Sequence, residues 1–71
     1  MKAKDLLAIL HRAPLGYVVT RQRGGHRKLE APGRPALLFA FHDSDTIGSV
    51  MVKKILVNSV GLTADEIDEI L

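Results

Sequence analysis

The chain has 71 residues, the size of one domain and close to the lower limit at which a hydrophobic core suffices without cross-links. Its 46% hydrophobic and 25% charged residues indicate a globular rather than a disordered protein. The chain has no cysteine, which excludes disulfides, thiolate metal sites and a cysteine nucleophile.

The net charge of +2 conceals an asymmetry along the chain. Five Lys or Arg and a single acid, Glu30, lie between Arg21 and Arg34, whereas the last nine residues carry four acids and no base. This pattern predicts a polyanion-attracting region and a solvated acidic face. Such a basic run is most often only a solvated surface, so charge alone favours nucleic acid modestly.

The only continuous apolar run near the start, residues 6–10, follows two lysines. It is too short to cross a membrane and has no small-residue cleavage site after it. We therefore expect no membrane segment and no signal peptide, and a cytoplasmic location by default.

The first predicted element is a helix from about Lys2 to Arg12, because apolar residues recur at helical spacing along one stripe (Ala3, Leu6, Leu7 and Leu10). Pro14 ends it, since the residue before a proline is pushed out of the α region. His11 falls in the last turn and is interpreted as a surface residue.

The stretch Arg21-Gln22-Arg23-Gly24-Gly25-His26-Arg27-Lys28 predicts a β-hairpin, with the two glycines as the turn. The first strand runs from Tyr17 to Arg23, and the second begins at His26. In this register Arg23 faces His26, Gln22 faces Arg27 and Arg21 faces Lys28. Because faces alternate along a strand, one face carries Arg21, Arg23, His26 and Lys28.

The opposite face of this hairpin carries Arg27, and we expect Val18 and Leu29 there to point into the core. Tyr17 is placed on the basic face, where it covers the start of the strand.

A turn at residues 31–35 leads to a third strand, residues 36–41, in which alternate side chains (Leu37, Phe39 and Phe41) face the core. If Leu29 pairs with Leu37, then Ala40 lies opposite His26 and His42 is its diagonal neighbour.

A polar loop, residues 42–46, precedes a second helix whose stripe is Val52, Ile55, Leu56 and Val60, with Gly61 as its stop. Thr63 and Glu66 form a capping-box pattern that starts a short last helix. The order is α-β-β-β-α: an α+β fold with a three-stranded antiparallel sheet packed on two helices, plus the short C-terminal helix, in one domain over residues 1–71.

The motifs of most enzyme classes are missing. The three histidines have no metal-ligand spacing, and no phosphate loop or dinucleotide fingerprint occurs. No metal or cofactor is therefore predicted. The chemistry that remains is acid–base catalysis by histidine, the side chain that titrates near neutrality. Without further support, a histidine beside a glycine turn is most often an ordinary strand-edge residue.

The order of these motifs resembles the HicA toxin family: a helix, a strand ending in Arg-Gln-Arg-Gly-Gly-His, two further strands and Ile-Leu-Val-Asn-Ser-Val-Gly-Leu-Thr. The resemblance implies a double-stranded-RNA-binding-domain-like fold and the metal-independent endoribonuclease (mRNA interferase) activity of a bacterial type II toxin–antitoxin system. It also implies that a HicB-type antitoxin covers His26. The family motif Gly-Ser-His maps onto Gly24, Gly25 and His26, so Gly25 departs from it and supplies no hydroxyl.

By this resemblance His26 is the catalytic general acid or base, and His42, after the third strand, is the candidate for a second proton-transfer role. Arg21, Arg23, Arg27 and Lys28 are expected to bind RNA, with Arg27 less important because it points away in the predicted register. Two alternatives stay open. The same face could hold RNA without cutting it, or the basic hairpin could dock an acidic protein partner.

Overall fold

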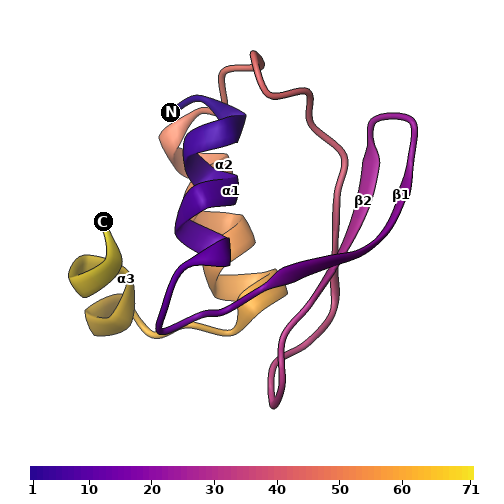
Figure 1. The fold of residues 1–71 in the computed structure, drawn as a ribbon. Coiled ribbons are helices and arrows are strands. Elements are labelled where there is room, and N and C mark those ends of the chain that lie inside the picture. Colours follow the sequence, from indigo (N-terminus) through magenta and orange to yellow (C-terminus); the bar gives the residue numbers. More distant parts are fainter.

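The computed structural model describes all 71 residues, and its elements run α1 (Ala3–His11), β1 (Val18–Arg23), β2 (His26–Glu30), β3 (Leu37–Phe39), α2 (Ser49–Lys54), η1 (Ile55–Val60) and α3 (Ala64–Ile70). The three strands form one antiparallel sheet in the order β1-β2-β3. Figure 1 shows α1 and α2 side by side, with the β1–β2 hairpin extending away from them. The predicted α+β arrangement is confirmed.

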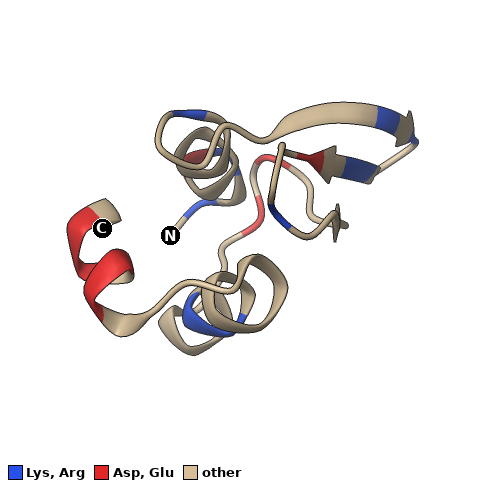
Figure 2. Ribbon diagram, turned by 90° about the horizontal axis from the view of Figure 1, so that it is seen from below, with Lys and Arg blue, Asp and Glu red and all other residues tan.

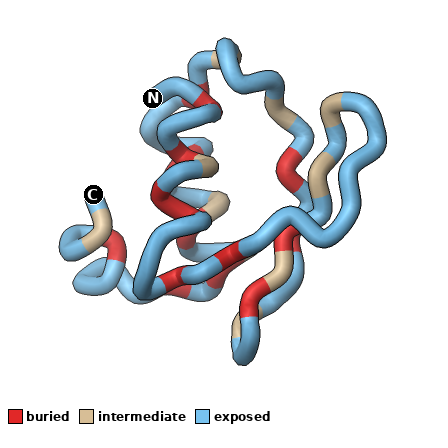
Figure 3. The backbone as a smooth tube through the Cα atoms, in the orientation of Figure 1, coloured by how far each residue is buried: buried red, intermediate tan, exposed pale blue.

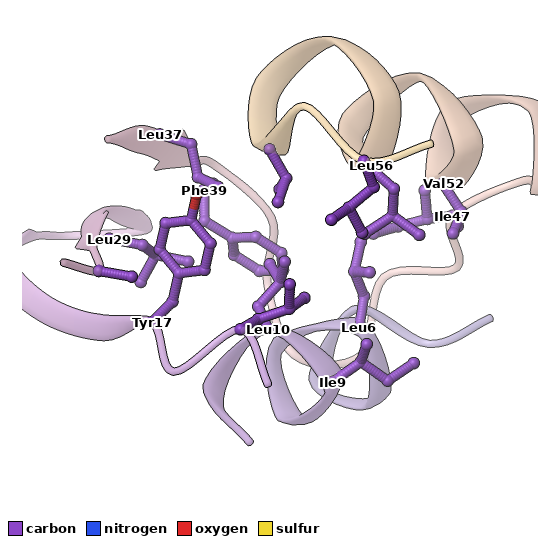
Figure 4. Packing of buried hydrophobic residues seen from close by; sticks show 14 of the residues in the cluster. Leu6, Ile9, Leu10, Tyr17, Leu29, Leu37, Phe39, Ile47, Val52 and Leu56 are labelled. Carbon is purple, nitrogen blue, oxygen red and sulfur yellow. The ribbon is translucent and has the colours of Figure 1, made fainter. Parts of the chain in front are cut away.

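The core lies between the helices and one face of the sheet. Its 16 buried residues are all apolar or aromatic, and they come from every helix, from β2 and β3, and from the segments that connect the elements. Figure 4 shows Leu6 and Leu10 of α1, Leu29, Leu37 and Phe39 of the sheet, and Leu56 pointing toward one another. Figure 3 shows that burial stops before the hairpin tip, where the residues are exposed on β1 and exposed or intermediate on the turn and β2. The tip is therefore free to serve a ligand.

The hairpin register is the predicted one, with Arg23 opposite His26, Gln22 opposite Arg27 and Arg21 opposite Lys28. The pairing of Leu29 with Leu37 is also confirmed. Strand β3 is shorter than expected, because its pairing ends at Phe39. Phe41 still reaches the core from outside the strand and meets Phe39 edge-on, with the ring centroids 5.3 Å apart.

The predicted faces at the start of β1 are wrong. The register shifts between Val19 and Arg21, so that Thr20 is an extra residue and Val19, not Thr20, lies opposite Leu29. A bulge of this kind reverses the alternation upstream of it. Tyr17 therefore turns into the core and is only 1% exposed, whereas Val18 is 48% exposed.

The buried Tyr17 remains satisfied because its hydroxyl donates a 2.7 Å hydrogen bond to the carbonyl oxygen of Pro35. Burial raises the pKa of this phenol, although the positive charge of Arg34 acts in the opposite direction. The bond ties the start of β1 to the chain just before β3.

The C-terminal part follows the sequence prediction. Gly61 ends the second helical segment in the left-handed conformation, with φ of 85°. Thr63 and Glu66 form the reciprocal capping box, and the bond from the Thr63 backbone lowers the pKa of the Glu66 carboxyl. The second half of the predicted second helix, η1, has π-helical hydrogen bonding.

Candidate functional site

One face of the hairpin and the neighbouring strand enclose a shallow hollow of about 300 Å³. Its lining is made of five side chains: Arg21, Arg23, His26, Lys28 and Leu38. Four of these are the residues that the sequence placed on one face. The cross-strand pairs Arg21–Lys28 and Arg23–His26 bring them together from β1 and β2.

The turn between the strands is as tight as the sequence predicted. Gly24 has φ of 60°, and Gly25 does not have positive φ. One positive φ at the first central position is the pattern of a type II′ turn, which matches the twist of paired strands. Because only two residues separate the strands, Arg23 and His26 are held opposite one another at the tip.

The charge of the hollow is of one sign. It is lined by three permanent cations and one imidazole, and no carboxylate lines it. All four of these side chains belong to exposed residues. Figure 2 shows Lys and Arg on the hairpin at one end of the molecule and the acidic α3 at the other end. The molecule is 34 Å long, and exposed charges further apart than the Debye length of about 8 Å are largely screened at physiological salt, so α3 at the opposite end has little effect on the hollow.

His42 lies directly against the hairpin turn. A Cβ placed on Gly25 would be only 3.1 Å from His42 Cε1, so the imidazole covers the space that a side chain at Gly25 would need. The sequence placed His42 diagonal to His26 in an extended third strand. Instead, His42 lies beyond β3, and the loop carries it to the turn residue next to His26.

The loop that carries His42 is held by several bonds. Asp45 accepts from the His42 backbone N–H through Oδ2 at 2.8 Å, and its own N–H donates to the His42 carbonyl at 2.9 Å. The N–H of Ala3, at the start of α1, donates to the carbonyl of Asp45 at 2.8 Å. The imidazole is therefore presented from a braced loop rather than from a free one.

Arg27 completes this bracing from the other face of the hairpin. Both terminal nitrogens of its guanidinium donate to Asp43 Oδ1 at 3.0 Å, and the Arg27 side chain is only 17% exposed. Arg27 is thus separated from the hollow that holds the other four predicted residues. Its contact with RNA stays a prediction, whereas its contact with the His42 loop is a structural fact.

No group of three or more His, Cys, Asp or Glu side chains is arranged to hold a metal ion. No helix has the length and apolar character needed to cross a membrane.

Two residues of this region were missed from the sequence. Leu38 was placed on the outward face but was not connected with the basic cluster, although a large aliphatic residue facing outward between two inward-facing ones is a detectable signal. Asp43 was assigned only to a polar loop. Its pairing with Arg27 depends on the path of that loop, which no local pattern specifies.

Comparison with known proteins gives one family. The model of the HicA toxin of bacterial toxin–antitoxin systems matches residues 3–62, which is most of the chain and includes the whole hollow. The helix α3 lies beyond the matched region. No curated protein and no solved structure matches the chain significantly, so the likeness to a double-stranded-RNA-binding domain stays a prediction.

Proposed function

The chain belongs to the HicA toxin family, and we propose that this toxin of a toxin–antitoxin system is an endoribonuclease that cuts mRNA with His26 as general acid or base. The observation that carries the proposal is the hollow itself, in which one exposed imidazole is surrounded by three cations from the same hairpin. Cleavage of a phosphodiester needs cations to hold it and at least one group to move a proton.

In the proposed reaction the ribose 2′-oxygen attacks the adjacent phosphorus and the bond from phosphorus to the 5′-oxygen breaks. The products are a 2′,3′-cyclic phosphate and a 5′-hydroxyl. His26 takes the proton from the 2′-hydroxyl or gives one to the departing 5′-oxygen. A positioned acid or base of this kind contributes roughly 10²–10⁴-fold in rate.

Arg21, Arg23 and Lys28 supply the electrostatic part of the proposal. Fixed cations beside the scissile phosphate stabilise the charge that develops on its oxygens, and they hold the flanking phosphates in register. These three side chains need little rearrangement, because the cross-strand pairing already directs them to one side of the sheet.

His42 is the proposed partner for the second proton transfer. Its ring lies against Gly25, the residue next to His26, and its loop is braced by Asp45. A second imidazole near the first would allow one to act as base and the other as acid. The absence of a side chain at Gly25 is what allows His42 to approach so closely.

The family implies an antitoxin partner. We propose a HicB-type antitoxin that covers the His26 face, because occupying the hollow would block RNA and shield the imidazole together. The three exposed cations there favour an acidic surface on that partner.

A second candidate function is RNA binding without cleavage. It is favoured by one observation: three cations and Leu38 line the hollow together with His26, and their contacts with a strand would not depend on whether His26 reacts. The two functions differ only in the fate of the bound RNA.

The test is cleavage of a mixed-sequence RNA, with EDTA present, by the wild type and by His26→Ala. His11→Ala is the matched control, because His11 is also exposed but lies on α1, outside the hollow. We expect the wild type and His11→Ala to cut RNA but not DNA of the same sequence, and His26→Ala to bind RNA without cutting it. Equal cleavage by wild type and His26→Ala would refute the catalytic role, and binding without cleavage by every variant would support the second candidate.

A further inference from the structure

Leu38 is an apolar side chain in a place where the fold does not need one. It is 63% exposed, whereas its neighbours Leu37 and Phe39 are 8% and 1% exposed. Strand alternation explains the orientation, since the two neighbours enter the core and Leu38 must face the other way. Because the core does not use this side chain, its hydrophobic surface is available to a ligand.

Leu38 lies at a defined point within the basic cluster. Lys28 of β2 is its cross-strand partner, and Arg21 of β1 is in turn the partner of Lys28. Paired side chains of adjacent strands lie about 4.5–5.5 Å apart at Cβ. The hollow therefore has cations on its β1 and β2 side, a single apolar wall on its β3 side, and His26 one step nearer the turn.

This combination selects among anionic ligands. A simple phosphate or a carboxylate would use the cations and leave Leu38 in water. A nucleotide has an anionic phosphate and, a short distance away, a base whose flat face is poorly hydrated. It can therefore use both sides of the hollow at once.

We infer that Leu38 is the base-binding platform of this site, on which the base of one nucleotide beside the scissile phosphate packs while Arg21 and Lys28 hold the phosphate. The inference rests on the proposed function and adds to it how the RNA is oriented across the sheet. An aliphatic side chain offers no hydrogen bond to a base edge. The contact therefore accepts every base, with larger purines favoured over pyrimidines, and an unpaired base over one in a duplex.

The test is a double-mutant cycle between the protein and the RNA. All binding measurements use the His26→Ala background and 2′-O-methyl RNA, which has no free 2′-hydroxyl to attack phosphorus, so that the RNA stays intact whether or not His26 is the catalytic group. The ligands are a short single-stranded RNA and a set of the same RNAs with one abasic nucleotide, placed at each position in turn. Leu71→Ala is the matched control, because Leu71 is also an exposed leucine (56%) but follows α3, outside the hollow.

We expect Leu38→Ala to weaken binding of the intact RNA about fivefold, since it removes most of one partly covered aliphatic side chain, and Leu71→Ala to have no effect. Removing the base at one position of the RNA should weaken binding to the protein that has Leu38. The same abasic RNA should bind the Leu38→Ala variant as well as the intact RNA does. Leu38→Phe, which presents a larger flat face, should bind the intact RNA more tightly than Leu38 does. Tighter binding by Leu38→Phe could not result from misfolding, so it separates a lost base contact from a damaged fold.

The platform would be overturned if Leu38→Ala bound the intact RNA as tightly as the protein with Leu38. It would also be overturned if, at every abasic position, the loss from the missing base and the loss from Leu38→Ala were simply additive. The proposed function fails separately. If a protein with His26→Ala cuts RNA as the wild type does, the catalytic role is lost while a coupled Leu38–base pair still supports the platform. Normal His26-dependent cleavage with no coupling at Leu38 leaves the catalytic role intact and rejects the platform.

Discussion

The salt dependence of RNA binding tests which basic residues touch the strand. From sequence, four cations were expected to bind RNA. The structure places Arg21, Arg23 and Lys28 in the hollow and pairs Arg27 with Asp43 on the other face. The perturbation is therefore removal of one charge at a time: Arg23→Gln from the hollow and Arg27→Gln from the ion pair.

The magnitude follows from counterion release, because each neutralised phosphate contributes about −0.7 to the slope of log K against log salt for a single strand. Three contacts give a slope of about −2.1, so a rise from about 50 to 200 mM salt should weaken binding about 18-fold. With one contact removed, the same rise in salt should weaken binding only about sevenfold, and with a fourth contact it should weaken binding about 49-fold.

The assay is fluorescence anisotropy with a labelled single-stranded RNA in the His26→Ala background. The parent protein and its Arg27→Gln variant should both give a slope near −2.1, whereas the slope for Arg23→Gln should be only about −1.4. A wild-type slope near −2.8 that drops on Arg27→Gln would mean that Arg27 binds RNA despite its ion pair. Equal slopes for Arg23→Gln and the parent would mean that the hollow does not contact phosphate.

Three further predictions concern stability and the turn. Tyr17→Phe should lower the free energy of unfolding by about 1 kcal/mol, because one buried hydrogen bond is lost. Since burial raises the pKa of Tyr17, the contribution of its neutral hydroxyl to stability is complete below pH 10 and is lost as the pH rises above 10. The free energy of unfolding from urea melts at pH 8 to 11 should therefore depend less on pH in the variant than in the wild type. Glu66→Ala should lower the Tm and flatten its acid dependence. The bond from the Thr63 backbone N–H lowers the pKa of Glu66, so this carboxylate stabilises the fold above pH 4.5, and the effect is lost as the pH falls below that value; an unchanged Tm at pH 7 would contradict the capping box. Gly25→Ser should fold normally, since Gly25 does not have positive φ, but should displace the His42 ring; an unchanged NMR shift of that ring would contradict the close approach.

The hairpin could be predicted from sequence because its determinants are local. Two glycines fix the loop length, the loop length fixes the register, and the register assigns each basic residue to a face. Arg23 and His26 are therefore paired in the structure as predicted, and Arg27 lies on the opposite face.

The features that were missed depend on contacts between distant segments. The bulge at Thr20 reversed the faces upstream of it, and it is the burial of Tyr17 that shows the reversal. A run of Tyr-Val-Val-Thr satisfies strand preferences in either register, so the sequence could not choose. The position of His42 depends likewise on the Asp43–Arg27 pair and on bonds from the start of α1.

The most direct test of His26 as the proton-transfer group is single-turnover cleavage of one mapped RNA, with the affinity measured in the same series. We predict that His26→Ala lowers the rate of the chemical step roughly 10²–10⁴-fold while the dissociation constant stays close to that of the wild type. Wild-type and His26→Ala proteins that cut the same bond at the same rate would contradict it.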